Sequence, residues 1–249
     1  MRKIFLVLML VGLSKVVVAK DIAEYKQERL IAKILNQQVK KHRTVQSSVY
    51  SILARYPEKV DAVMTVALAR YPDEYRQILI GALTAEPSLA SDVIKNAIKA
   101  NVAPSSELVK IAIEAEPAYA QEIVNTAVQF SPNEIENIVR VAIRTEPYDT
   151  INIVNNTAAT HPNKILNILT AAFTAIPEQA SNIVKGILAL FPNQADTVVK
   201  TAVAQSNDSQ SNHIVTAAID SGVDKDTAIA AAIAGGAKKE SLAKLHNDY

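Results

Sequence analysis

Side chains that carry out catalysis or bind metals are few and scattered in this sequence of 249 residues. It has no cysteine, and its four histidines show no H-x-x-x-H or H-E-x-x-H spacing; they are His42, His161, His213 and His246. Zinc sites draw on clustered cysteine, histidine and carboxylate side chains, and phosphate sites often use glycine-rich loops, which are also lacking. We therefore expect no metal site, no cofactor and no enzymatic activity.

Asparagine recurs at intervals of fifteen residues in the second half of the chain, at Asn137, Asn152, Asn167 and Asn182. An amide side chain both donates and accepts hydrogen bonds, so a row of amides on an exposed surface could bind a peptide, a glycan or a neighbouring subunit. The alternative is that the repeat was copied with an asparagine that does no harm on a solvated face. We favour the alternative, but keep the four residues as a candidate partner-binding surface. If successive helices are antiparallel, Asn137 and Asn167 should lie in one layer of helices and Asn152 and Asn182 in the other.

A second candidate surface comes from the stretch Ala-Arg-Tyr-Pro, which occurs twice, fifteen residues apart. It places Arg55 beside Tyr56 and Arg70 beside Tyr71. Tyrosine and arginine are enriched where proteins bind one another. Tyrosine can equally pack over the ends of helices, and we favour that structural role.

The elements that must position these residues are indicated by the prolines, most of which are fifteen residues apart. Two intervals, of 17 and 13 residues, flank the displaced Pro104 and together restore the register; the ten are Pro57, Pro72, Pro87, Pro104, Pro117, Pro132, Pro147, Pro162, Pro177 and Pro192. With proline as position 1 of a fifteen-residue repeat, positions 4, 7, 8, 11 and 12 are mostly aliphatic, and position 11 is mostly alanine. This is the apolar stripe of an amphipathic helix, with proline suited to its first turn.

One long kinked helix is the alternative, but each interior proline would cost about 3 kcal/mol. We therefore predict short helices of about 11–13 residues, joined by turns of two to four. Short connections make successive helices antiparallel neighbours, and stacking must supply the core that no single repeat can form. The predicted fold is an all-α solenoid of about thirteen single-helix repeats. It resembles HEAT, armadillo and tetratricopeptide solenoids in architecture only, because the fifteen-residue period matches none of them.

The two ends of the chain differ from the repeats. Residues 1–19 have the pattern of a cleaved signal peptide: Arg2 and Lys3, a ten-residue apolar run over 4–13, and small residues before a cut after Ala19. A membrane anchor is the alternative, but a span needs about 20 apolar residues. We expect residues 20–41 to form an N-terminal capping helix, residues 42–236 the repeat array, and residues 237–249 a tail or short helix. No linker interrupts the array, so we expect one domain.

Charge is nearly balanced over the whole chain, at +1, which favours neither nucleic acid nor anionic membranes as partners. It is uneven locally: residues 20–55 carry a net +5 and residues 107–149 a net −5. Such opposed charges could steer a partner or align copies head to tail.

The sequence thus predicts an exported, non-catalytic scaffold, in the periplasm or outside the cell, that presents a protein- or glycan-binding surface. The alternative is a structural subunit that self-associates into an extracellular fibre or matrix. Polar residues in both end segments favour capped ends, and so the first interpretation.

Overall fold

The computed structural model describes residues 25–41 and 43–242, and almost all of these residues are helical. The all-α class and the fifteen-residue helical repeat are confirmed. The predicted signal peptide, the first five residues of the predicted capping helix and residues 243–249 lie outside the described residues. Within the described part of the chain, no helix combines the length and the apolarity needed to cross a membrane.

One repeat consists of a three-residue 3₁₀ turn, an eleven-residue α-helix and a single linking residue. In the repeat that begins at Pro72, the 3₁₀ turn is Pro72–Glu74 and the helix is Tyr75–Ala85. Proline has no N–H to donate, and it keeps the residue before it out of the α conformation. From Pro72 onward, apart from the displaced Pro104, the helix before each proline therefore ends at position 14, one residue before the linking residue.

A single linking residue suffices because its backbone serves both neighbouring elements. The N–H of Tyr71 donates to the carbonyl of Ala67 at 2.9 Å, which closes the preceding helix. The carbonyl of Tyr71 accepts from the N–H of Glu74 at 3.0 Å, which closes the following 3₁₀ turn. The backbone groups at each junction are thus satisfied without a longer loop.

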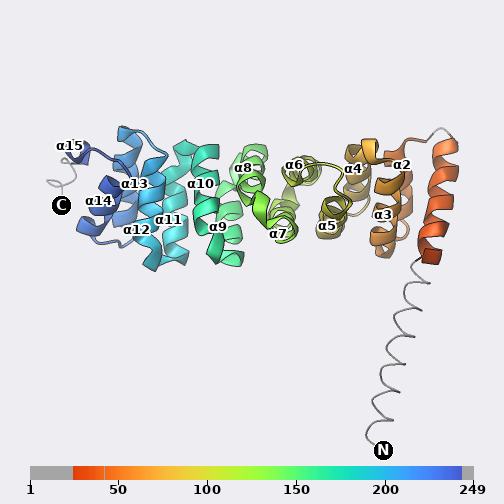
Figure 1. The fold of residues 1–249 in the computed structure, drawn as a ribbon, viewed down its shortest axis with the longest axis horizontal. Coiled ribbons are helices and arrows are strands. Elements are labelled where there is room, and N and C mark those ends of the chain that lie inside the picture. Colours follow the sequence, from red (N-terminus) through yellow and green to blue (C-terminus); the bar gives the residue numbers. More distant parts are fainter. Residues whose placement is uncertain (1–24, 42, 243–249) are drawn as a thin grey trace, which may run out of the picture. The chain divides into compact units, whose positions relative to one another are not determined.

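The chain divides into two compact units, Met1–Val102 and Ala103–Tyr249, shown with their helices in Figure 1. The described part of the first unit begins with an N-terminal helix over 25–40. Its repeats follow as α2 (Val45–Leu53), η1 (Pro57–Lys59), α3 (Val60–Arg70), η2 (Pro72–Glu74), α4 (Tyr75–Ala85), η3 (Pro87–Leu89) and α5 (Ala90–Ala100).

The second unit continues the same pattern and ends on three helices without proline. Its elements are α6 (Ser105–Ala115), η4 (Pro117–Tyr119), α7 (Ala120–Phe130), η5 (Pro132–Glu134), α8 (Ile135–Thr145), η6 (Pro147–Asp149), α9 (Thr150–Thr160), η7 (Pro162–Lys164), α10 (Ile165–Ala175), η8 (Pro177–Gln179), α11 (Ala180–Leu190), η9 (Pro192–Gln194), α12 (Ala195–Ala204), α13 (Asp208–Asp220), α14 (Lys225–Ala234) and α15 (Lys239–Leu242). In place of proline, the side chain of Asn207 caps α13 and that of Asp224 caps α14.

The division between the units falls at the one repeat whose proline is displaced. Here α5 ends at Asn101 in the left-handed conformation, with φ of 51°. A short loop without a 3₁₀ turn then leads to Pro104, and α6 starts at its expected position in the repeat. Asparagine is among the few non-glycine residues that adopt this conformation readily.

Within each unit, a helix packs mainly against the second helix along the chain rather than the next one. The helices therefore form two layers. In the first unit, α2 and α4 form one layer and α3 and α5 the other; in the second, α6, α8, α10, α12 and α14 form one layer and α7, α9, α11 and α13 the other, with α15 packed on α13 (Figure 1).

The core is the predicted apolar stripe. From α2 to α13, the residue at position 8 is completely buried in every helix. The alanines at position 11 are also buried, with at most 2% of their surface exposed. Burial of each larger aliphatic side chain contributes about 1.5–3 kcal/mol, so the stability of the array is shared among many equivalent contacts.

Candidate functional site

The outer face of each layer is built from a recurring pairing of repeat positions. Position 5 of one helix lies opposite position 10 of the next helix in the layer, as in Asp61 Oδ1, which accepts from Asn96 Nδ2 at 2.7 Å. Position 9 lies opposite position 14, as in Lys185 Nζ and Asp220 Oδ2 at 3.1 Å. Residues 35 apart in the chain are therefore neighbours on the surface.

Three grooves in the described residues lie between helices of one layer and share this register. Most of the lining residues that belong to the repeats occupy positions 9 and 13 of one helix and positions 10, 13 and 14 of the helix beside it. One of them lies between α6 and α8, has a volume of about 370 Å³, and is lined by Lys110, Glu114, Val141, Arg144 and Thr145. Its size is at the lower end of the range for sites that hold small ligands or side chains.

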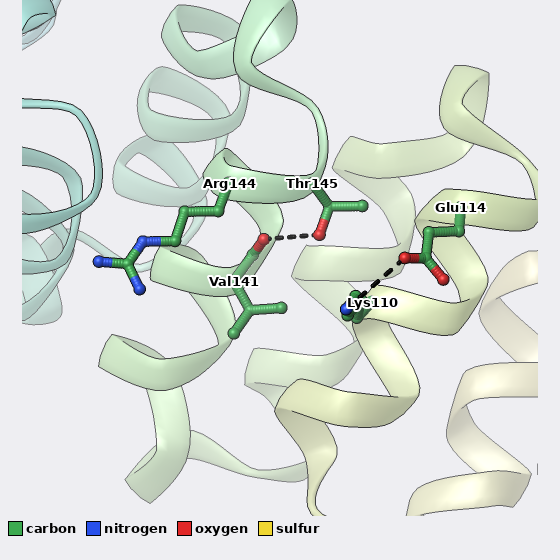
Figure 2. A pocket seen from close by; sticks show the side chains of 5 residues that line it. All are labelled: Lys110, Glu114, Val141, Arg144 and Thr145. Carbon is green, nitrogen blue, oxygen red and sulfur yellow. Dashed lines mark hydrogen bonds and ion pairs between the residues drawn. The ribbon is translucent and has the colours of Figure 1, made fainter.

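The walls of the α6–α8 groove are apolar, with charges at the rim (Figure 2). The hydroxyl of Thr145 donates to the carbonyl of Val141 at 2.8 Å, so the methyl group of Thr145 is left toward α6. Lys110 Nζ lies 3.8 Å from Glu114 Oε1, a loose ion pair across one turn of α6. The side chain of Arg144 extends away from that pair, on the other side of the groove.

A second groove, of about 280 Å³, lies between α3 and α5 in the first unit. Its lining includes the position-9 residue Thr65, Asn96 at position 10 and Lys99 at position 13. A third, of about 210 Å³, lies between the N-terminal helix and α3, with Arg29 and Arg70 in its lining. All three grooves therefore combine aliphatic walls with at least one basic side chain.

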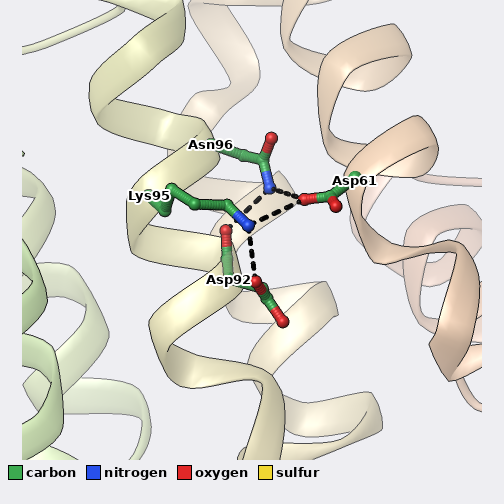
Figure 3. Close-up of polar contacts among 4 residues, drawn as sticks. All are labelled: Asp61, Asp92, Lys95 and Asn96. Atoms are coloured by element: carbon green, nitrogen blue, oxygen red, sulfur yellow. Dashed lines mark hydrogen bonds and ion pairs between the residues drawn. The ribbon is translucent and has the colours of Figure 1, made fainter. Parts of the chain in front are cut away.

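A charged cluster stands beside the α3–α5 groove (Figure 3). Lys95 Nζ bridges Asp92 Oδ1 at 2.6 Å and Asp61 Oδ1 at 3.1 Å, and Asn96 joins the two helices as described above. The amide of Asn96 and then the charge and hydrogen bond of Lys95 lower the pKa of Asp61. The pKa of Lys95 is raised, first by the hydrogen bond that Lys95 donates to Asp92 and then by its contact with Asp61.

The predicted asparagine row is split between the two layers. Asn137 on α8 and Asn167 on α10 belong to one layer, and Asn152 on α9 and Asn182 on α11 to the other. Asn137, Asn152 and Asn182 are exposed, whereas Asn167 is half-buried. The residues do not form one surface of four amides.

Three of these amides bond within the protein. Asn137 accepts a hydrogen bond from Arg140, Asn152 donates to Asp149 at 2.6 Å, and Asn167 donates to Glu136 of α8 at 2.6 Å. The last of these links two helices of a layer, which is a structural use of the side chain.

The predicted tyrosine and arginine residues lie at positions 14 and 15, at the ends of α2 and α3. Arg55 and Tyr56 are exposed. Tyr71 is half-buried, and its hydroxyl donates to Asn36 Oδ1 of the N-terminal helix at 3.3 Å. Arg70 lines the groove beside that helix. The hydroxyl of Tyr71 thus joins the end of α3 to the N-terminal helix, while Arg55 and Tyr56 face solvent.

The sequence analysis did not find the grooves, nor an amide network that joins α7 to α9. In that network Asn125 donates to Asn156 at 3.1 Å, Asn156 donates to Gln121 at 2.7 Å, and Thr160 donates to Asn125 at 3.2 Å. The signal that could have revealed both features is the 35-residue separation of positions 5 and 10 and of positions 9 and 14.

Among the described residues, no group of three or more histidine or carboxylate side chains is placed to hold a metal ion. No protein-family model, no curated protein and no solved structure matches this chain.

Proposed function

We propose that this protein is an exported, non-catalytic scaffold, an α-solenoid with successive helices antiparallel, that binds a segment of another protein. The observation that supports this proposal is the α6–α8 groove, with Val141 and Thr145 in its wall and Lys110 and Arg144 at its rim. The groove belongs to the repeat register, so its shape is set by packed helices rather than by a mobile loop. A preformed site avoids the entropy cost of ordering on binding.

The chemistry of the groove favours an acidic and aliphatic segment. An aliphatic side chain of the partner would contact Val141 and the methyl group of Thr145. A carboxylate of the partner would pair with Arg144, whose planar guanidinium suits carboxylates. A sugar would need hydrogen-bonding groups in the wall instead, and the hydroxyl of Thr145 is already bonded to the carbonyl of Val141.

Selection from a random peptide display library tests this proposal. We expect the protein to enrich peptides that combine acidic and aliphatic residues. Arg144→Glu should weaken their binding by about tenfold or more, because a contact with a charged group contributes about 1.5–3 kcal/mol. The matched control is Lys200→Glu, which removes an exposed basic side chain from position 9 of α12 and should leave peptide binding unchanged.

Two results would overturn the proposed site. One is equal loss of binding in both variants, which would indicate a general charge effect. The other is binding on a glycan array with no peptide enrichment, which would replace the protein partner with a glycan.

The alternative proposal is a structural subunit that self-associates. The exposed apolar side chain of Ile233 on α14 favours contact between copies.

A further inference from the structure

The last full helix of the array, α14, exposes positions that the rest of its unit buries. Position 12 is at most 3% exposed in every helix from α6 to α13, but Ile233 at this position of α14 is 42% exposed. Position 8, completely buried from α2 to α13, is only half-buried at Ile229. The side chains at positions 8 and 12 are therefore more exposed in α14 than in the preceding helices of the unit.

Among the described residues, α14 has a layer neighbour on one side only. It packs against α12 in its own layer, and α15 lies on α13 in the other layer. The side of α14 that would face a following helix carries positions 5, 9, 12 and 13. These are Asp226, Ala230, Ile233 and Ala234, and all are exposed.

The first unit carries a surface of matching register on α2. Among the described residues, α2 is the first helix of its own layer in that unit, since the N-terminal helix lies along α3, to which Tyr71 and Asn36 join it. Positions 6, 10 and 14 are the ones that elsewhere face the preceding helix. In α2 they are Ser47, Ser51 and Arg55.

Charge favours a contact between these two surfaces. Residues 25–55 contain seven lysines and arginines against one glutamate, whereas α14 begins with the exposed carboxylates of Asp224 and Asp226.

We propose that a second copy of this chain covers α14, with its α2 in the place of the next helix of the layer. In this register Asp226 of one copy lies opposite Ser51 of the other, and Ala230 lies opposite Arg55. The contact joins two different surfaces, so it is heterologous and builds a ring or an open filament. The contact does not use the α6–α8 groove, so a test of self-association is independent of a test of peptide binding.

Light scattering over a range of protein concentrations tests the contact. The protein is purified from its full-length expressed form, and its N-terminus is established by mass spectrometry. We expect the mass to rise with concentration. Ile233→Glu should weaken association by about tenfold or more, because a buried unpaired carboxylate is unfavourable. The matched control, Leu166→Glu, alters a side chain that is 51% exposed on α10 of the same layer and should associate like the original chain.

A mixing experiment tests whether the contact is head to tail. Ser51→Glu should block the α2 surface and Ile233→Glu the α14 surface, so neither variant should associate alone. A mixture of the two variants retains one intact α14 surface and one intact α2 surface, and it should form dimers that grow no further. Circular dichroism establishes that both variants keep the helix content of the original chain.

Three outcomes would overturn the proposal. A mass independent of concentration would show that no copy covers α14. A mixture that stays monomeric would exclude the pairing of α2 with α14. Association that appears only after removal of residues 243–249 would show that the chain's own C-terminal segment is the cover.

Discussion

At the scale of single residues, several polar side chains of the outer faces join one helix to the next in its layer. The cluster around Asp61 is the clearest case, because its carboxylate is bonded by both Asn96 and Lys95 of the neighbouring helix. Exposed ion pairs contribute only about 0.2–1 kcal/mol each, and less at high salt. Their value to the protein lies in the repetition of such links along the array.

The lowered pKa of Asp61 predicts the direction of its effect on stability with pH. Its carboxylate gives up a proton more readily in the folded chain than in the unfolded chain, where the pKa is about 3.9. Its contribution is therefore complete at pH values above about 4 and is lost as the pH falls through the folded-state pKa. The raised pKa of Lys95 acts oppositely: that contribution is lost as the pH rises above about 10.4 and through the folded-state value.

Asp61→Asn should lower the free energy of unfolding by less than about 1 kcal/mol at pH 7. The difference from the original chain should shrink as the pH falls below about 4, because both side chains are then uncharged. Urea unfolding at several pH values measures it. The control is Asp196→Asn at the same repeat position of α12, whose counterpart in the register is Ala231; it should change stability little at any pH. A difference for Asp61→Asn that stays constant down to acidic pH would contradict this interpretation.

At the scale of elements, the sequence predicts where most helices begin and end, but not which side chains of neighbouring helices meet. Proline acts locally, through its missing N–H and its effect on the preceding residue, so the helix boundaries follow from the period alone. Which side chains meet is decided between helices 30 residues apart in the chain. The asparagine row and its division between the two layers could be proposed from the sequence, whereas the grooves were not found because their linings depend on which residues of neighbouring helices meet.

Glycine at position 10 marks where two helices of a layer come closest. Gly81→Ala would place a methyl group against backbone, 2.5 Å from the carbonyl oxygen of Gln46. The α2 and α4 helices would have to separate, and we expect a loss of about 1–3 kcal/mol. Thermal or urea unfolding measures this loss.

The same substitution at the same position of α11 is the control. Gly186→Ala would meet the side-chain amide of Asn155 at 2.8 Å. That side chain can turn aside, and alanine favours a helix over glycine by about 1 kcal/mol. Gly186→Ala should therefore be neutral or stabilising. If both variants lose the same stability, close backbone approach is not what selects glycine at this position.

At the scale of the whole molecule, the features that break the repeat are the informative ones. The displaced Pro104 and the left-handed Asn101 coincide with the division into two compact units. The spacing of the prolines reveals the displacement of Pro104 but not the division into units, because the division depends on how the helices pack. The uncovered face of α14 is likewise visible only by comparison with buried positions of other helices.

The proposed export of the protein depends on residues 1–19 and is tested on the intact chain. An apolar run of ten residues is long enough for a signal peptide and too short for a span of about 20 residues. Expressed in cells that export proteins, the chain should be recovered outside the cytoplasm with Lys20 as its first residue, as intact-mass measurement would show.

Leu8→Arg places a charge in the apolar run, where insertion is unfavourable by about 2.5–3.5 kcal/mol, and should leave the uncut chain inside the cell. Gln37→Arg, on an exposed position of the N-terminal helix, should be exported and cut as before. An uncut original chain held in the membrane fraction would make residues 1–19 an anchor, and the scaffold would then act from the membrane surface.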